Sequence, residues 1–429
     1  MKLVSHKAKG FQSQIAKMLK SSSLFDQTII DRTSAIIHEV RSRGDRALIE
    51  LTRKFDGARL TPKSLGISRT ELEDARPSSR KVRTAIREAT RNIEQFSKTS
   101  MRRDWTMKNS HGARVGEKFD PFQRVGLYIP GGTAPLVSTA LMTITLARVA
   151  GCREIVVCTP CGPQGQINAD LCFALTQAGA TEVFRIGGAQ AIAAMALGTK
   201  TIRPVNKIFG PGNAYVVAAK CALFGQVAID LLPGPSEVLI IADQTAQPEW
   251  IAADLIAQAE HGSGHERVVL ISPAKRTIDR VRDAIDGQLH NRNRATFIRK
   301  ALQANGWAIH VANLSQAIEI TNQFAPEHCE IMAADKQRIA KSIRTAGAIF
   351  LGDFSPTVLG DYVAGPSHVL PTGGAGKSFA GLTVDQFQRR TSVVQYSRAA
   401  LNRAVDSVSA FATMEGLDGH GRSATIRLD

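Results

Sequence analysis

The segment FAPEHCEI, at residues 324–331, places a carboxylate and an imidazole next to each other in the chain, as Glu327 and His328. These two types of side chain serve most often as general acids and bases near neutral pH. The pair is therefore a candidate for proton transfer in a catalytic site. The structural alternative is an ion pair at the edge of a strand, and the two residues alone do not decide between the two interpretations.

A second group of residues has side chains that bind metals, and it is spread over three segments. In a predicted helix over residues 248–261, Gln258 and His261 lie three residues apart and therefore on one face. The other members are Asp361 and His368 in a loop rich in glycine and proline, and Glu415 and His420 in the C-terminal segment EGLDGHGR. Imidazoles and carboxylates from separate segments can form a metal site if the fold brings them together. Each also has an ordinary explanation, since a histidine at a helix end commonly interacts with the helix dipole.

Three glycine-rich turns that follow predicted strands indicate a cleft for a ligand. They are YIPGGTAPL at 128–136, RIGGAQAIAA at 185–194 and IFGPGNAYV at 208–216. Glycine leaves backbone N–H groups accessible, and ligands of open α/β sheets bind where the strands end. We expect the three turns to line one cleft, although no predicted strand is followed by the G-x-G-x-x-G fingerprint of dinucleotide-binding domains.

Two further motifs are better explained by structure than by chemistry. GGAGKS at 373–378 resembles the end of a phosphate-binding loop, but Pro371 stands where that loop needs glycine and no strand precedes it. Cys158 and Cys161 have the spacing of a redox pair, but they end a predicted strand and no second cysteine pair accompanies them. We therefore expect both cysteines to be structural.

Two series of strands alternating with helices must position these residues. Up to about residue 110, apolar residues recur at three- and four-residue spacing, which predicts helices. Beyond it, the runs RVGLYI, REIVVCTP, TEVFRI and VNKIFG form one series, and SEVLIIAD, RVVLIS, WAIHVA and GAIFLG form another. Such alternation is typical of parallel sheets covered by helices, so we predict an α/β fold with two Rossmann-like domains.

The last 50 or so residues contain too little apolar material for a separate core. They are predicted to form one helix, SRAALNRAVDSVSAFATMEGL, and a short terminal strand. This tail must therefore pack on another part of the chain or on another subunit.

Composition limits the class of protein. The 429 residues have no apolar run near the roughly 20 residues of a membrane span and no signal-peptide pattern, so we expect a cytoplasmic protein with no membrane partner. Six cysteines in a chain of this length agree with a reducing compartment. The formal net charge is +16, and a predicted helix carries Arg80, Arg83, Arg87 and Arg91 at helical spacing. We expect a solvated face there rather than a nucleic-acid-binding surface, because no binding motif and no interleaved aromatic residues accompany the arginines.

Taken together, these motifs resemble those of the histidinol dehydrogenase family over essentially the whole chain. The matching segments, in the family's order and near its spacing, are VRSRGDRALIELTRKFDG, VGLYIPGGTAPLVSTALM, GGAQAIAA, IFGPGNAYV, PGPSEVLIIAD, AQAEHG, APEH, GDYVAGPSHVLPT and EGLDGHGR. The resemblance implies oxidation of L-histidinol through L-histidinal to L-histidine in two NAD-dependent steps. It also implies one Zn2+ per site and a homodimer whose active sites are shared between subunits.

Each role follows from the match of a residue to a family motif. The implied zinc ligands are Gln258, His261 and Asp361, with His420 of the partner subunit, and these residues and His328 would also contact the substrate. His328 would act as base in alcohol oxidation, and Glu327 would activate water in aldehyde oxidation. The remaining matches are Ser236, His368 and Glu415 for substrate binding, and Tyr128, Gln190 and Asn213 for cofactor binding.

The expected division of the chain follows from the strand series and the resemblance. Residues 1–23 would be an N-terminal dimerisation segment. Residues 24–118 together with 237–378 would form a discontinuous first α/β domain that carries the zinc ligands and the catalytic pair. Residues 119–236 would form a second α/β domain on the NAD side, and residues 379–429 would form the tail that reaches the partner.

Three departures from the family pattern keep other interpretations open. Ser367 stands where the family usually has asparagine, Pro233 stands where alanine is common, and EHGSGHERVVL differs from the usual stretch after the zinc histidine. A paralogous zinc- and NAD-dependent dehydrogenase of another amino or hydroxy compound would also fit the site. A basic nucleic-acid-binding protein is the non-enzymatic alternative.

Overall fold

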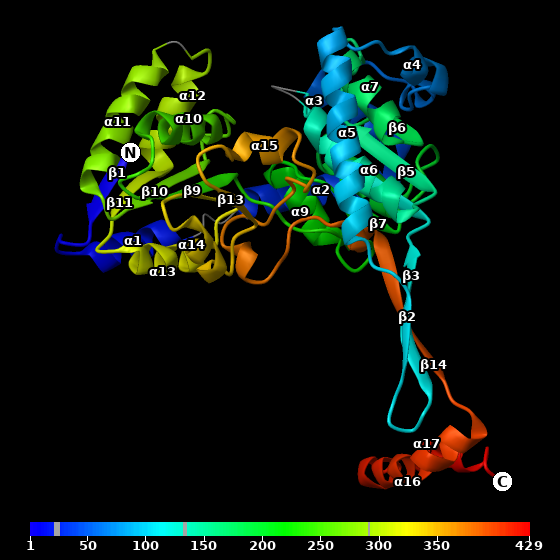
Figure 1. Ribbon diagram of the computed structural model, residues 1–429. Helices are drawn as coiled ribbons and strands as arrows, with labels where there is room; N and C mark the ends of the chain where they lie inside the picture. Colours follow the sequence, from blue (N-terminus) through cyan, green and yellow to red (C-terminus); the bar gives the residue numbers. More distant parts are fainter. Residues whose placement is uncertain (21–25, 132–134, 291) are drawn as a thin grey trace.

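The computed structural model describes residues 1–20, 26–131, 135–290 and 292–429. It has two α/β lobes and a long antiparallel ribbon, which ends in two helices far from both lobes (Figure 1). The N-terminus lies in the first lobe, and the C-terminus lies beyond the ribbon. In the described part of the chain, no helix is long and apolar enough to cross a membrane.

The first lobe is a six-stranded parallel sheet with helices on both faces, in the strand order β1-β11-β10-β9-β12-β13. Its strands are β1 (Lys2–Ser5), β9 (Glu237–Ala242), β10 (Arg267–Ser272), β11 (Gly306–His310), β12 (His328–Met332) and β13 (Ala348–Leu351). One face packs on α10 (Pro248–Ala259), α11 (Lys275–Leu289) and α12 (Ala295–Asn305). The other face packs on α1 (Phe11–Leu19), α13 (Leu314–Phe324) and α14 (Lys336–Ser342). The short helix α15 (Thr357–Tyr362) lies beside α10.

The second lobe is a five-stranded parallel sheet in the order β6-β5-β4-β7-β8. Its strands are β4 (Arg124–Tyr128), β5 (Glu154–Thr159), β6 (Glu182–Arg185), β7 (Lys207–Phe209) and β8 (Ala228–Ile229). The helices on one face are α4 (Arg69–Asp74), α5 (Arg80–Ser100), α6 (Val137–Ala150) and α7 (Ala169–Ala178). Those on the other face are α2 (Gln27–Arg43), α3 (Asp45–Asp56), α8 (Gly188–Leu197) and α9 (Ala214–Leu223).

Both sheets have the strand order of a doubly wound fold, which confirms the predicted α/β class with two Rossmann-like parallel sheets. If strands are counted along the chain within each lobe, both read 3-2-1-4-5, and β1 is added at the edge of the first sheet. All eight predicted runs form strands. The order reverses between β4 and β7 in the second lobe and between β9 and β12 in the first. The strand β12 was not predicted, because its polar residues obscure the apolar pattern.

The helices between residues 27 and 100 pack on the second lobe, which differs from the expected assignment of 24–118 to the first. Helix α2 contacts α8 and α9, α4 contacts α7, and α5 contacts α6. The apolar faces of these helices are therefore buried against the 119–236 sheet. The expected boundary between residues 23 and 24 lies outside the described residues. On α5 the four predicted arginines are exposed, opposite buried Ile86 and Ile93.

The ribbon consists of β2 (Trp105–Lys108), β3 (Arg114–Pro121) and β14 (Gln388–Gln395), paired in the antiparallel order β14-β3-β2. It joins the second lobe to the C-terminal helices α16 (Arg398–Glu415) and α17 (Asp418–Thr425). The predicted helix is present, but the expected terminal strand is wrong, because residues 418–425 are helical and pack against α16. Short 3-10 turns complete the chain at η1 (Pro62–Ser64), η2 (Ala375–Lys377) and η3 (Val384–Phe387).

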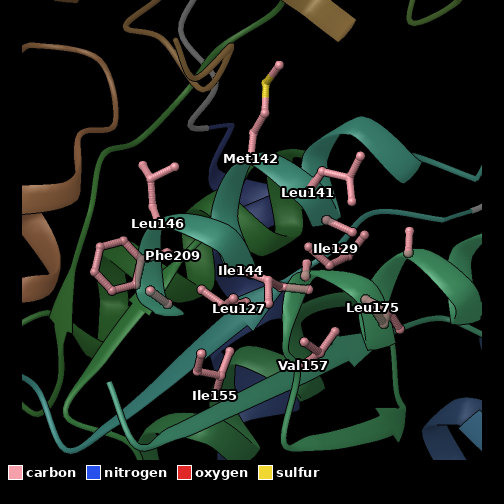
Figure 2. Close-up of a cluster of buried hydrophobic side chains, with 14 of the residues drawn as sticks. Leu127, Ile129, Leu141, Met142, Ile144, Leu146, Ile155, Val157, Leu175 and Phe209 are labelled. Carbon is pink, nitrogen blue, oxygen red and sulfur yellow. The ribbon is translucent and has the colours of Figure 1, made fainter. Parts of the chain in front are cut away.

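The core of the second lobe illustrates how the sheet fixes its neighbours. Side chains of β4 alternate, so Leu127 faces the cluster formed with α6 and β5 in Figure 2. On the opposite face, a Cβ added at Gly126 would lie 2.7 Å from the Met195 sulfur. Glycine at this position therefore lets α8 pack closely on the strand.

Replacing Leu127, which is fully buried, by alanine should lower the free energy of unfolding by about 2–5 kcal/mol, because the cavity cannot fully collapse. The denaturant midpoint measures this change. Leu3→Ala removes the same atoms from a side chain that is 41% exposed and should have a smaller effect. Equal losses in the two variants would contradict the central place of Leu127 in the core.

Candidate active site

Seven of the expected site residues gather at the amino ends of two neighbouring strands of the first sheet, β9 and β12. We call this set the polar cluster, and its members are Ser236, Gln258, His261, Glu327, His328, Asp361 and His368. Ser236 and Glu327 directly precede β9 and β12, which are paired neighbours. The helix after a parallel strand returns to the sheet's amino edge, so the end of α10 brings Gln258 and His261 to the same place.

The backbone of Glu237, the first residue of β9, holds both Glu327 and His328. Its N–H donates to Glu327 Oε2 at 2.8 Å, and its carbonyl accepts from His328 Nδ1 at 3.0 Å. Because a carbonyl can only accept, Nδ1 carries the proton and Nε2 keeps a free lone pair. Glu327 Oε2 also lies 3.6 Å from His328 Nδ1.

Burial sets the charge of this pair, since both side chains are less than a tenth exposed. Loss of hydration raises the pKa of Glu327 well above its usual range, and hydrogen bonds from the Glu237 N–H and from Ser236 oppose this shift only in part. Burial lowers the pKa of His328 to about 4, which keeps the imidazole neutral at physiological pH.

The neighbours of the pair have ligand atoms that are free to bind another group. Asp361 Oδ1 lies 3.7 Å from His328 Nε2, and burial raises the pKa of Asp361 to about 6 while His261 opposes that shift. His261 Nδ1 donates to the Gln258 carbonyl at 3.0 Å, so His261 Nε2 has its lone pair free. Gln258 is buried, and its Nε2 has no hydrogen-bond partner among the described residues.

His368 connects the polar cluster to the second lobe. Its Nε2 lies 3.1 Å from Oγ1 of Thr139, a buried residue of α6. Burial lowers the pKa of His368 to about 4, and the charge of His261 lowers it further. The cluster therefore lies at the junction of the two lobes.

The donor set agrees with zinc in its chemistry and is incomplete within one chain. One imidazole, one carboxylate and one amide are compatible with zinc, which usually takes four ligands. Across the ranges that the structure describes, no group of three or more His, Cys, Asp or Glu side chains could hold a metal. The set of Gln258, His261 and Asp361 is not such a group, because one of its three members is an amide.

Two expected site residues are absent from the polar cluster of the same chain. Glu415 ends α16 and His420 lies in α17, and both are exposed. Figure 1 shows both helices beyond the ribbon, away from the lobes. If these residues serve a site of this kind, it must be in another copy of the chain.

The three residues expected at the cofactor line one cavity of about 1480 Å³ in the second lobe, which we call the turn cavity. Tyr128 ends β4, Asn213 caps α9, and Gln190 lies buried in the first turn of α8. The Tyr128 hydroxyl accepts from the N–H of Gly188 at 3.0 Å. Each of the three glycine-rich turns contributes to this cavity, as predicted, although residues 132–134 lie outside the described part.

Two residues of these sites were missed in the sequence. Glu237 acts through its backbone, and its place beside Ser236 in PGPSEV gave no sign of that. Asp56, in KFDG, lines the turn cavity with a buried Oδ2 that has no partner in the described structure, and burial raises its pKa to about 6.

The two motifs expected to be structural have no site around them. Cys158 and Cys161 are buried, and burial raises their pKa values to about 12 and about 11. GGAGKS forms a short 3-10 turn at η2, and the strand before it in the chain, β13, ends at Leu351.

A family model described as histidinol dehydrogenase matches residues 19–428. The chain belongs to the histidinol dehydrogenase family. This family catalyses the final steps of histidine biosynthesis, so the protein is an oxidoreductase. The family identity agrees with the resemblance found in the motifs.

Individual relatives support this membership over the whole chain. The chain is 43% identical to a histidinol dehydrogenase of Geobacillus kaustophilus over 92% of each chain, and 41% identical to one of Synechococcus over 100% and 98%. A crystal structure of histidinol dehydrogenase from Elizabethkingia anophelis superposes with a TM-score of 0.95 and 32% identity, covering 100% and 98%. An acetylating aldehyde dehydrogenase from Geobacillus thermoglucosidasius shares the fold alone, at 15% identity and a TM-score of 0.50.

The cysteines provide a test of the buried-thiol interpretation. In the native protein, Cys221, which is exposed, should react with a thiol reagent first, and the five buried cysteines should react only after denaturation. Burial disfavours the reactive thiolate, because it raises the pKa of thiols such as Cys158. Mass spectrometry after timed alkylation measures the order. Rapid native labelling of Cys158 or Cys161 would contradict it.

Proposed function

We propose that the protein oxidises L-histidinol through L-histidinal to L-histidine, with NAD as the oxidant and one zinc ion at each shared site of a homodimer. The observation that carries this proposal is the pair of Glu327 and His328, held by one backbone residue beside the free ligand atoms of Gln258, His261 and Asp361. Two bases of different kind match the two oxidations, because the first removes a proton from the alcohol hydroxyl and the second removes one from water.

His328 is the base for the alcohol step. Its Nδ1 donates to the Glu237 carbonyl, so Nε2 is the atom that takes the hydroxyl proton. Because burial lowers the pKa of His328, the ring is neutral and ready to accept this proton at physiological pH.

Glu327 is the base for the aldehyde step, in which water must add to the carbonyl before the second oxidation. The burial that raises the pKa of Glu327 also makes its ionised form a stronger base. The Glu237 N–H fixes Oε2, so the carboxylate approaches the water in one orientation.

Gln258, His261 and Asp361, with His420 of the partner subunit, would hold the zinc. Zinc bound there would supply a positive charge that orients the amine and imidazole of the substrate. The His261 tautomer supports this role, because its Nδ1–H is bonded to the Gln258 carbonyl, the arrangement that most histidine ligands of metals share. Ser236, His368 and Glu415 would complete the substrate site.

The turn cavity would bind NAD through Tyr128, Gln190 and Asn213. NAD bound there would accept the hydride in each oxidation. The cavity lies at the carboxyl ends of β4 and β7, where the strand order reverses, and that position is the usual ligand site of an open α/β sheet.

The tail would dock on a second copy of the chain. Its described helices expose Phe411, Met414 and Ile426, which are 60%, 71% and 51% exposed. Large apolar side chains grouped at the end of a projecting ribbon are typical of a surface that a partner covers. Such docking would bring Glu415 and His420 to the polar cluster of the partner.

The two bases should be separable by mutation. Glu327→Gln should slow aldehyde oxidation more than alcohol oxidation, and His328→Asn should do the opposite, with losses of about 10²–10⁴-fold. Single-turnover NADH formation from L-histidinol and from L-histidinal measures each step. The unmodified protein should yield about two NADH per limiting L-histidinol, one for each oxidation step.

Two outcomes would reject this division of labour. One is a yield near one NADH per L-histidinol, or accumulation of free aldehyde, in the unmodified protein. The other is a small and equal loss in both half-reactions for each variant. The thermal midpoint of both variants should be compared with that of the unmodified chain, so that misfolding is recognised.

Mixed dimers should reveal whether the site is shared. His261→Asn and His420→Asn chains should each be inactive alone. In a mixed dimer one site collects both lesions and the other collects neither, so activity should return to about a quarter of the original after random exchange. Size-exclusion chromatography with differently tagged chains verifies the exchange. Continued inactivity of exchanged dimers would mean that His420 serves its own chain.

A further inference from the structure

A group of three polar residues, two of them buried and one half-buried, lies next to the polar cluster, and neither proposed oxidation step uses it. Its members are Asp254 of α10, Glu330 of β12 and Thr357 of α15. Glu330 is 1% exposed and Thr357 is 7% exposed. Burying a carboxyl group costs free energy unless it is bonded, so this position needs an explanation.

Thr357 binds one oxygen of Glu330 with two donors. The Thr357 N–H donates to Glu330 Oε1 at 2.7 Å, and the Thr357 hydroxyl donates to the same oxygen. Thr357 is the first residue of α15, so these bonds attach the start of that helix to the sheet. Figure 1 shows α15 next to α10, at the side of the first lobe that faces the second.

The Asp254 carboxyl group of α10 lies next to the carboxyl group of Glu330. Glu330 Oε2 receives no hydrogen bond from the described residues, and the Asp254 carboxyl group is its charged neighbour. Two carboxylates in contact repel unless a proton lies between them. Burial and the neighbouring Asp254 raise the pKa of Glu330, and burial raises the pKa of Asp254, which favours one proton shared between the two carboxyl groups.

Each of the three residues lies on the same face of the same helix or strand as a residue of the polar cluster. Asp254 precedes Gln258 by four residues on α10, and Thr357 precedes Asp361 by four on α15, so each pair shares a helix face. Glu330 follows His328 by two residues on β12, so both point to the same face of the sheet. Cys329 and Ile331 point to the opposite face and pack with α13.

We propose that Glu330 is a positioning residue, which uses Asp254 and Thr357 to fix the mutual placement of the three elements that carry Gln258, His328 and Asp361. This inference rests on the proposed function, which assigns those three residues to one site. Glu330 touches neither substrate nor cofactor in this role. It acts through the elements to which it is bonded, as the outer partners of metal ligands do.

The experiment compares two buried threonines in one lobe. Thr357→Val removes the hydroxyl that donates to Glu330 at nearly constant shape. Thr321→Val is the matched control, because Thr321 is fully buried in α13 and its hydroxyl bonds only within that helix, to Ala317. Zinc affinity of the full chain, measured by chelator competition, should fall about 10–100-fold for Thr357→Val. The control should keep the original affinity, and Thr357→Ser should restore it.

Variants of Glu330 test the same point from the other side. Glu330→Gln imitates the protonated acid, because its amide oxygen can accept from Thr357 and its amide nitrogen can donate to Asp254. It should stay close to the original zinc affinity and kcat, whereas Glu330→Leu should lose both. Because Glu330→Leu leaves Asp254 without a partner, its thermal midpoint should be recorded as well.

Two results would overturn the proposal, and they are distinguishable. If Thr357→Val and Thr321→Val lose the same thermal stability and both keep the original zinc affinity and kcat, Thr357 has only a structural role. If instead His261→Asn keeps the zinc affinity of the unmodified protein, the ligand set of the proposed function is wrong and the positioning role falls with it.

Discussion

The proposed active site depends on the backbone of one residue, Glu237, at the start of β9. Its N–H holds Glu327, and its carbonyl holds His328 and fixes the tautomer of that ring, so one residue orients both bases of the proposed reaction. Those bonds exist because β9 and β12 are parallel neighbours in register, with His328 opposite Val238. The sheet of the first lobe therefore sets the positions of Glu327 and His328, and a shift of that register would separate both side chains from the Glu237 backbone.

The two sheets could be predicted from the sequence, but which helices cover each sheet could not. Buried parallel strands such as VLIIA and VVLIS are continuous apolar runs, which is the pattern that helix-covered sheets require. The strand HCEIM was missed because its polar residues His328 and Glu330 are buried. In a half-exposed strand the polar residues face solvent, so this strand does not show the usual pattern of polar and apolar positions. The ribbon was missed because β14 exposes both its faces and shows no apolar side. The helices of residues 27–100 were predicted, but an apolar helix face does not specify which of two sheets it will cover.

The polar cluster could be named by residue from its motifs, while its convergence required the fold. Gln258 is far in the chain from Asp361 and His368, and the three meet because α10 and the 361–368 segment both end at the amino edge of the first sheet. The role of Asp254 and Thr357 could not be read from the sequence, since neither belongs to a motif. In the proposed positioning role, both depend on Glu330, which accepts hydrogen bonds from Thr357 and has Asp254 as its charged neighbour.

The two lobes present opposite edges of their sheets to the junction. The first contributes the amino ends of β9 and β12, and the second contributes the carboxyl ends of β4 and β7, with His368 and Thr139 bonded between them. In the proposed reaction, the hydride donor and its acceptor are thus held by different lobes. Hydride transfer needs the reacting atoms within about 3–3.5 Å, so a small rotation of one lobe against the other would change the rate without altering any residue of either site. In that reaction the angle between the lobes would therefore affect the rate, and selection could change it through residues that never touch substrate.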